Sequence, residues 1–170
     1  MKDFNDLKEE SQVIFLLSLS ELVLNKVSEF EEKKMLEKVI NSSWGWLLNK
    51  DIEADALYFL LENLDETGVL NYMMLKDFNS KNHEIFSCIA NALAYTAYKA
   101  YVFEGEKYLP QTIESVDCDT IIEFIENFNK IYNKPMLMHE FVSYLLKVRE
   151  LDTVDTIEGA RLFLSQILSK

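Results

Sequence analysis

The sequence predicts an all-α protein, a single-domain bundle of seven to eight helices that spans residues 1–170. Three observations support this prediction. Apolar residues recur at helical spacing in one segment after another, and no stretch alternates between apolar and polar residues as a strand does. The 170 residues include only 4 Gly and 2 Pro, too few for a loop-rich sandwich or barrel. With 49% apolar and 27% charged residues, the chain has the composition of a folded globular domain.

The first half of the chain predicts four helices. They are expected over residues 8–27, over 30–48, from a cap at Asp51 to an end at Gly68, and over 69–76. Capping-box spacing marks the first two starts, in Asp6 with Glu9 and Ser28 with Glu31. The apolar residues expected to face inward from the first three helices are Val13, Leu16, Leu17, Leu24 and Val27, then Met35, Leu36, Val39, Ile40 and Leu47, then Ile52, Ala56, Phe59, Leu60 and Leu64.

The segment 82–103 differs from the others because its apolar residues surround the helix axis instead of forming one stripe. A helix that is apolar on nearly all sides belongs in the centre of a bundle. Small residues would let neighbouring helices approach it closely, namely Ala90, Ala92, Ala94, Ala97 and Ala100. We therefore predict that 82–103 is the central helix.

Beyond a break at Glu104-Gly105-Glu106, Leu109-Pro110 starts a turn or short helix. Helices are then predicted over 119–132, from Pro135 to Glu150, and over 154–168. Capping-box spacing recurs in Thr120 with Glu123 and in Asp155 with Glu158. The residues expected to face inward are Ile121, Ile122, Ile125 and Phe128, then Ile157, Ala160, Leu164 and Ile167.

Two features predict a soluble, cytoplasmic protein. Cys88 and Cys118 lie in apolar contexts without metal-site or CxxC spacing, which favours reduced thiols in the core. The acidic N-terminus does not resemble a signal peptide, and the longest apolar stretch, Val13 to Leu24, is too short to span a membrane.

The net charge of −12 is concentrated in the middle of the chain. Residues 1–50 hold 9 acidic and 7 basic side chains, residues 51–131 hold 15 and 5, and residues 132–170 hold 5 of each. On the helix predicted over 119–132, Asp119, Glu123 and Glu126 share one face, unless Asp119 caps the helix. These charges are either solvated helix faces or a docking face for a basic protein.

No catalytic, cofactor or metal motif is present. His83 and His139 lack the neighbours that zinc and di-iron sites use, and no Gly-rich phosphate loop or nucleophile elbow occurs. An acidic chain with 2 Arg is a poor nucleic-acid binder. The most singular local feature is Trp44-Gly45-Trp46, for which we expect one buried ring and one partly exposed ring that packs or contributes to a binding surface.

Three segments together resemble the all-helical immunity-protein family numbered six among those of bacterial polymorphic toxin systems. They are Leu36-Glu37-Lys38-Val39-Ile40 leading to Trp44-Gly45-Trp46-Leu47, then Ala90-Asn91-Ala92-Leu93-Ala94-Tyr95-Thr96-Ala97-Tyr98, and then Tyr108-Leu109-Pro110-Gln111-Thr112-Ile113-Glu114-Ser115-Val116. The resemblance covers about residues 10–132, and residues 133–170 are expected to form a helical hairpin that completes the bundle.

The resemblance implies a cytoplasmic, non-catalytic protein without cofactors that binds and neutralises a co-encoded toxin domain. The acidic middle of the chain fits a basic toxin, such as a nuclease. The candidate contact residues are Glu62, Asp65, Glu66, Glu104, Glu106, Glu114, Asp117, Glu123 and Glu126, with Trp46 as an anchor. Two other hypotheses stay open: a structural or adaptor bundle that acts through oligomerisation, and a metal-dependent hydrolase that uses carboxylates.

Overall fold

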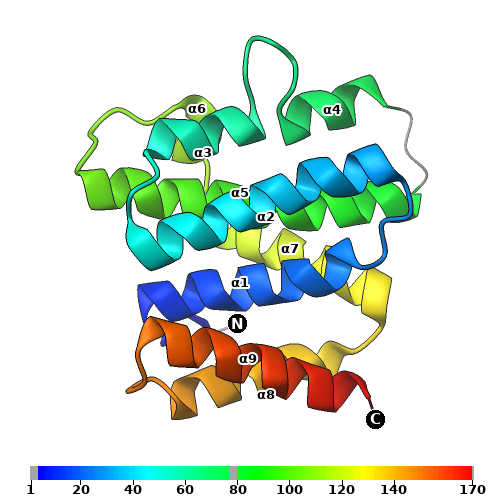
Figure 1. Ribbon diagram of the computed structural model, residues 1–170, viewed down its shortest axis with the longest axis vertical. Coiled ribbons are helices and arrows are strands. Elements are labelled where there is room, and N and C mark those ends of the chain that lie inside the picture. The colour runs from blue at the N-terminus through cyan, green and yellow to red at the C-terminus, as the bar shows by residue number, and fades with distance from the viewer. Residues whose placement is uncertain (1–3, 77–79, 170) are drawn as a thin grey trace.

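The computed structural model describes residues 4–76 and 80–169, and every regular element in these ranges is a helix (Figure 1). The nine helices are α1 (Glu9–Leu24), α2 (Phe30–Asn49), α3 (Ala54–Leu61), α4 (Val69–Leu75), α5 (Ser80–Glu104), α6 (Gln111–Glu114), α7 (Cys118–Tyr132), α8 (Pro135–Lys147) and α9 (Thr153–Leu168). The all-α prediction is confirmed. The four-residue α6 lies where the sequence predicted a turn or short helix.

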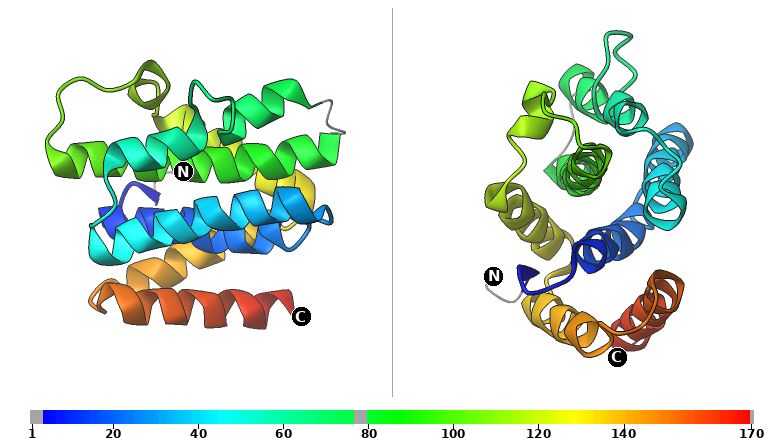
Figure 2. Two further views of the ribbon diagram at one scale, coloured as in Figure 1. Left: turned by 45° about the horizontal axis from the view of Figure 1, so that its top comes forward. Right: turned by 90° about the vertical axis from the view of Figure 1, so that its left-hand side faces the viewer.

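Helix α5 is the central helix, as its apolar residues predict. Figure 2 views α5 nearly end-on in its right-hand panel and shows it enclosed by other helices. Helices α1, α2, α3, α4, α6 and α7 all contact it. Of residues 85–97, only Asn91 is not buried, and Ala97 and Ala100 are completely buried at close helix contacts.

Helix α1 is also enclosed on all sides, which its apolar stripe did not predict. Every residue from 11 to 20 is buried, because α8 and α9 form a hairpin that covers the side of α1 facing away from α5. The ring of Phe141 stacks on Phe15 with 5.4 Å between centroids. The guanidinium of Arg161 donates to both carboxylate oxygens of Glu21, at 2.5 and 3.0 Å. The hairpin expected beyond residue 132 is therefore present, and it completes the bundle.

The prediction for the third helix is wrong in extent and in face. The helix ends at Leu61, and Glu53, not Asp51, is its N-cap. Its buried side chains are Ala54, Leu57 and Leu61, whereas Ala56, Phe59 and Leu64 are exposed. The run Leu57-Tyr58-Phe59-Leu60-Leu61 is apolar throughout, so its spacing does not fix which face of the helix is buried.

The predicted caps are also wrong. The N-caps of α1 and α2 are Lys8 and Glu29, without a side-chain cap. Asp117 caps α7 and forms a capping box with Thr120, three residues before the predicted position, and Asp152 caps α9 in place of Asp155. The buried face of α7 also differs from the predicted one, since Phe124 is completely buried and Ile122, expected in the core, is 47% exposed.

Candidate partner-binding surface

The connection between α3 and α4 is an ordered acidic loop, residues 62–68, which projects at the top of Figure 1. The amide nitrogen of Asn63 donates to the Phe59 carbonyl at 2.7 Å and to the Thr67 hydroxyl at 3.0 Å. The Asn63 amide oxygen accepts the backbone N–H of Thr67 at 3.1 Å. Glu66 has a left-handed backbone with φ of 56°. These bonds hold the loop in one conformation, which lowers the entropy lost when a partner binds.

Exposed apolar side chains lie among the carboxylates of this loop. Leu64 is fully exposed and Phe59 is 56% exposed. The neighbouring side chains of Asp65 and Glu66 are exposed and accept no hydrogen bond from the described residues. Burial of apolar side chains at the centre of a contact, with charges around them, is the usual arrangement of a protein–protein binding site.

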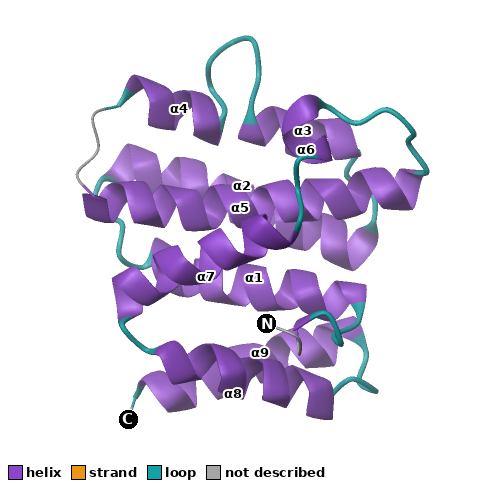
Figure 3. Ribbon diagram, turned by 180° about the vertical axis from the view of Figure 1, so that it is seen from behind, coloured by secondary structure: helices purple, strands orange, loops and turns teal. Residues whose placement is uncertain are grey.

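Helix α6 extends this acidic surface toward α7. The Thr112 hydroxyl donates to the Glu62 carboxylate at 2.6 Å, which fastens α6 to the end of α3. Burial, with Glu62 beside it, raises the pKa of Tyr58 on α3. Two residues separate α6 from Asp117, the N-cap of α7. Figure 3 shows α7 on the side of α5 that faces the viewer there.

We call this surface the acidic strip. It runs from the α3–α4 loop across α6 to the outer side of α7, and its carboxylates belong to Glu62, Asp65, Glu66, Glu114, Asp117, Asp119, Glu123 and Glu126. Two of them have structural partners: Glu62 binds Thr112, and Asp117 accepts the backbone N–H of Asp119 at 2.8 Å. The others are exposed and accept no side-chain bond within the described part of the chain.

The remaining two acidic candidates, Glu104 and Glu106, lie outside the strip. The Glu104 carboxylate accepts the N–H of Ala54 at 2.7 Å and so caps α3 from the end of α5. This is the end of α3 away from the loop, about 12 Å along the helix axis. Glu106 follows Gly105, whose φ of 75° turns the chain away from α5, and its side chain is exposed.

Trp46 is not a surface ring. Trp44 is 6% and Trp46 3% exposed, so the prediction that one of the two is partly exposed is wrong. Residues two apart on a helix point in nearly opposite directions, and a cation covers each ring. The Arg161 guanidinium lies 5.3 Å from the Trp44 ring centroid, and Lys50 Nζ lies 3.7 Å from that of Trp46.

The two cysteines differ in exposure. Cys88 is buried on α5, as expected, and burial raises the pKa of its thiol. Cys118 was also expected in the core, but it is exposed. As the first residue of α7 it follows the cap, where the helix start faces solvent.

The sequence analysis assigned the α3–α4 loop to the third helix, with Phe59 and Leu64 facing inward and Gly68 at its end, and it did not single out Asn63. Asn63 and Gly68 position the loop, and Phe59 and Leu64 supply its apolar surface. The run Asn63-Leu64-Asp65-Glu66-Thr67-Gly68 contains turn-forming residues and was a usable signal for a loop here. Within the described ranges, no group of three His, Cys, Asp or Glu side chains could hold a metal ion.

A family model described as Immunity protein Imm6 matches residues 11–131, which is more than two thirds of the chain. The chain belongs to the Imm6 family. An Imm6 protein is an immunity protein, and its cognate partner is a toxin. No curated protein and no solved structure matches the chain.

The Imm6 match starts inside α1 and ends in α7, so it leaves the α8–α9 hairpin outside. The three segments that carried the resemblance lie within it, and the first two supply core residues: Leu36, Val39, Trp44 and most of Ala90–Tyr98. In the third, Tyr108–Val116, only Ile113 is buried. The first two segments therefore describe the packing of the bundle, and the third also contributes exposed residues, among them Glu114. No helix of the described residues is long and apolar enough to cross a membrane.

Proposed function

We propose that this Imm6 protein neutralises its toxin by non-covalent binding through the acidic strip, without catalysing a reaction. The observation that carries the proposal is the α3–α4 loop, which presents Leu64, Asp65 and Glu66 to solvent in a conformation that Asn63 fixes. A preorganised loop with apolar side chains at its centre and charged side chains around them has the properties of a tight protein–protein binding site.

The charge of the strip supports a basic toxin domain as the partner. Between Tyr108 and Asn129 the chain carries five acidic side chains and no Lys or Arg. A nuclease is the toxin class that we propose, since its phosphate-binding cleft is basic and an acidic protein can occupy it. The protein would act in the cytoplasm of the cell that makes the toxin, as part of a polymorphic toxin system.

The test compares two double variants with equal loss of charge. Asp65→Asn with Glu66→Gln alters the loop, and Glu37→Gln with Glu140→Gln alters exposed carboxylates on α2 and α8. Exposed ion pairs contribute about 0.2–1 kcal/mol each, so the loop variant should weaken binding of the toxin encoded in the adjacent gene by about 2- to 30-fold. Association should slow with added salt, and the loop variant should be less sensitive to salt.

The control double variant should bind within about twofold of the parent, since its charges lie outside the strip. Survival of cells that co-express the toxin gives a second measurement. If the association rate does not change with salt concentration and the toxin binds both double variants with equal affinity, the acidic strip is not the binding surface. An adjacent gene that encodes no toxin would count against the whole proposal.

A further inference from the structure

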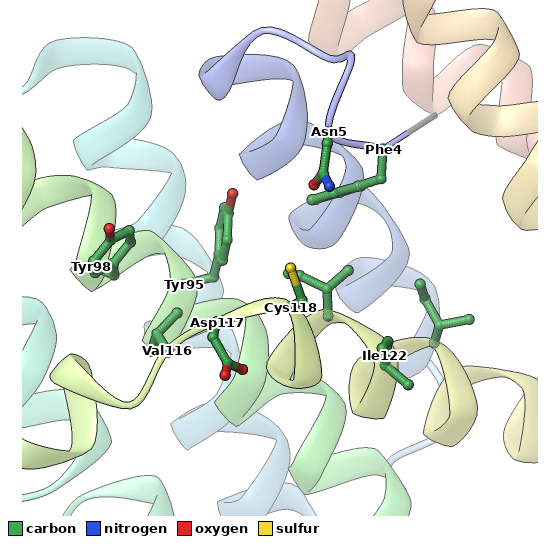
Figure 4. Close-up of a pocket in the computed structure, with 10 residues that line it drawn as sticks. Phe4, Asn5, Tyr95, Tyr98, Val116, Asp117, Cys118 and Ile122 are labelled. Carbon is green, nitrogen blue, oxygen red and sulfur yellow. The ribbon is translucent and has the colours of Figure 1, made fainter. Parts of the chain in front are cut away.

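A pocket of about 250 Å³ lies at the α7 end of the acidic strip, between α5, α7 and the segment before α1 (Figure 4). Tyr95 and Tyr98 line it from α5, Ile121 and Ile122 from α7, and Phe4 from the N-terminal segment. In Figure 4 the Cys118 thiol points into the space between Tyr95 and Phe4. The walls are therefore mainly apolar, with room for one large side chain.

Two polar side chains that line the pocket are engaged within the protein, the Tyr95 hydroxyl and the Asp117 carboxylate that caps α7. The Tyr95 hydroxyl donates to the Gln12 side chain at 2.5 Å, so Tyr95 presents its ring and not its hydroxyl. Beside the pocket, Lys99 has its Nζ 5.4 Å from the Tyr95 ring centroid and forms an ion pair with Glu9 at 2.8 Å. The pocket thus offers a mainly apolar surface, and its other polar groups are the Asn5 amide, the Tyr98 hydroxyl and the Cys118 thiol.

The rim of the pocket carries one carboxylate, Asp117, which lines it at the start of α7. Asp119, Glu123 and Glu126 follow on the exposed side of the same helix. An apolar occupant carried on a basic surface complements both the walls and the rim. A small neutral molecule would use the walls alone, and a second copy of this acidic chain would meet like charge.

We infer that the pocket receives one aromatic or long aliphatic side chain of the toxin, flanked on the toxin by basic residues. This inference rests on the proposed function and adds an apolar anchor to it at α7. Burial of one such side chain accounts for about 10- to 100-fold in affinity, more than any single exposed carboxylate of the strip contributes.

The accessibility of the pocket can be measured through the Cys118 thiol, because the chain has only 2 Cys and Cys88 is buried. A soluble maleimide should label Cys118 in the folded protein. With the toxin at ten times its dissociation constant, about one tenth of the protein is free, so labelling should slow about tenfold. In the control, Cys118→Ser with Gln166→Cys moves the thiol to an exposed site on α9, where labelling should stay equally fast with and without toxin.

A second variant fills the pocket without touching the core. Ile122 is 47% exposed, so Ile122→Trp can enlarge the wall while the protein stays folded. It should weaken toxin binding by about 10- to 100-fold. Leu162→Trp, at a 60% exposed position of α9, is the matched control and should not change binding.

The outcomes separate the inference from the proposed function. Full-rate labelling of Cys118 in the complex, together with normal toxin binding by Ile122→Trp, overturns the inference about the pocket. In that case, weaker toxin binding by the Asp65→Asn/Glu66→Gln variant would still support binding through the acidic strip. Protection of Cys118 that depends on the concentration of this protein alone would assign the pocket to a second copy and overturn the inference. Absence of any toxin binding overturns both.

Discussion

Replacing Gly68 with alanine would place a Cβ atom 2.6 Å from the carbonyl oxygen of Leu61 and 2.7 Å from the backbone nitrogen of Glu62. Ordinary contacts begin at 3.4 Å, so the two chain segments would have to separate by about 0.8 Å. Neither segment moves easily, since Leu61 is 1% exposed and the N–H of Glu62 donates to the Tyr58 carbonyl at 2.9 Å.

The magnitude follows from two opposing effects. Overpacking a closed contact costs about 1–3 kcal/mol. The φ of Gly68 is −71°, which alanine adopts readily, so its lower entropy in the unfolded chain offsets about 0.4–1 kcal/mol. We expect Gly68→Ala to lower the free energy of unfolding by about 1–2 kcal/mol and the Tm by about 2–8 °C.

Thermal and urea unfolding, followed by circular dichroism, measure this change. The matched control is Gly45→Ala in the C-terminal part of α2, where the added Cβ meets only the terminal methyl of Ile52, at 3.0 Å. Alanine is the better helix former by about 1 kcal/mol, so the control should be as stable as the parent or more stable. A Gly68→Ala variant with an unchanged or higher Tm would refute the close contact and, with it, the fixed position of the loop.

Two further predictions concern groups that the fold has placed in structural roles. Glu104→Ala removes the acceptor for the N–H of Ala54 and should cost about 1 kcal/mol in thermal unfolding, whereas Glu104→Gln, which keeps an oxygen acceptor, should cost less. Burial raises the pKa of the Tyr95 and Tyr101 phenols above the ordinary value of 10.0, so above about pH 10 the unfolded chain loses protons that the folded protein keeps. The free energy of unfolding should therefore fall as pH rises through that range. Tyr95→Phe, compared with its own stability at neutral pH, should show a smaller fall, and an equal fall would contradict the assignment.

The helices were predictable because each buries an apolar surface whose period is that of a helix. The enclosure of α1 on all sides was not predictable, because polar residues lie among its apolar ones. Ser11, Ser18 and Ser20 interrupt the apolar surface of α1, yet all three are buried. The Ser20 hydroxyl donates to the Leu16 carbonyl at 2.8 Å, a bond within the helix that lets a serine be buried without an outside partner.

The role of each carboxylate was not predictable from its neighbours in the sequence. Glu104 caps a helix that starts 50 residues earlier, and Glu62 binds Thr112, which lies 50 residues later. Charge patterning marks where acidic residues are dense. Only the packing of α3 against α5, and the bond from Thr112 on α6 to Glu62, separate the carboxylates with a structural partner from Asp65 and Glu66. The local charge runs therefore show where acidic residues lie along the chain, and not which of them have a hydrogen-bond partner within the protein.

The uneven charge along the chain becomes an uneven charge in space. Residues 132–170, with 5 acidic and 5 basic side chains, hold the α8–α9 hairpin at one end of the long axis, and the α3–α4 loop lies at the other end (Figure 1). Under the proposed binding through the acidic strip, a protein that is neutral at one end and acidic at the other would turn in the field of a basic partner before contact. The acidic end would then arrive first, and it carries Leu64 and Phe59, the exposed apolar side chains that contact would bury. In that proposal, orientation by charge and affinity by apolar burial act at the same end of the molecule.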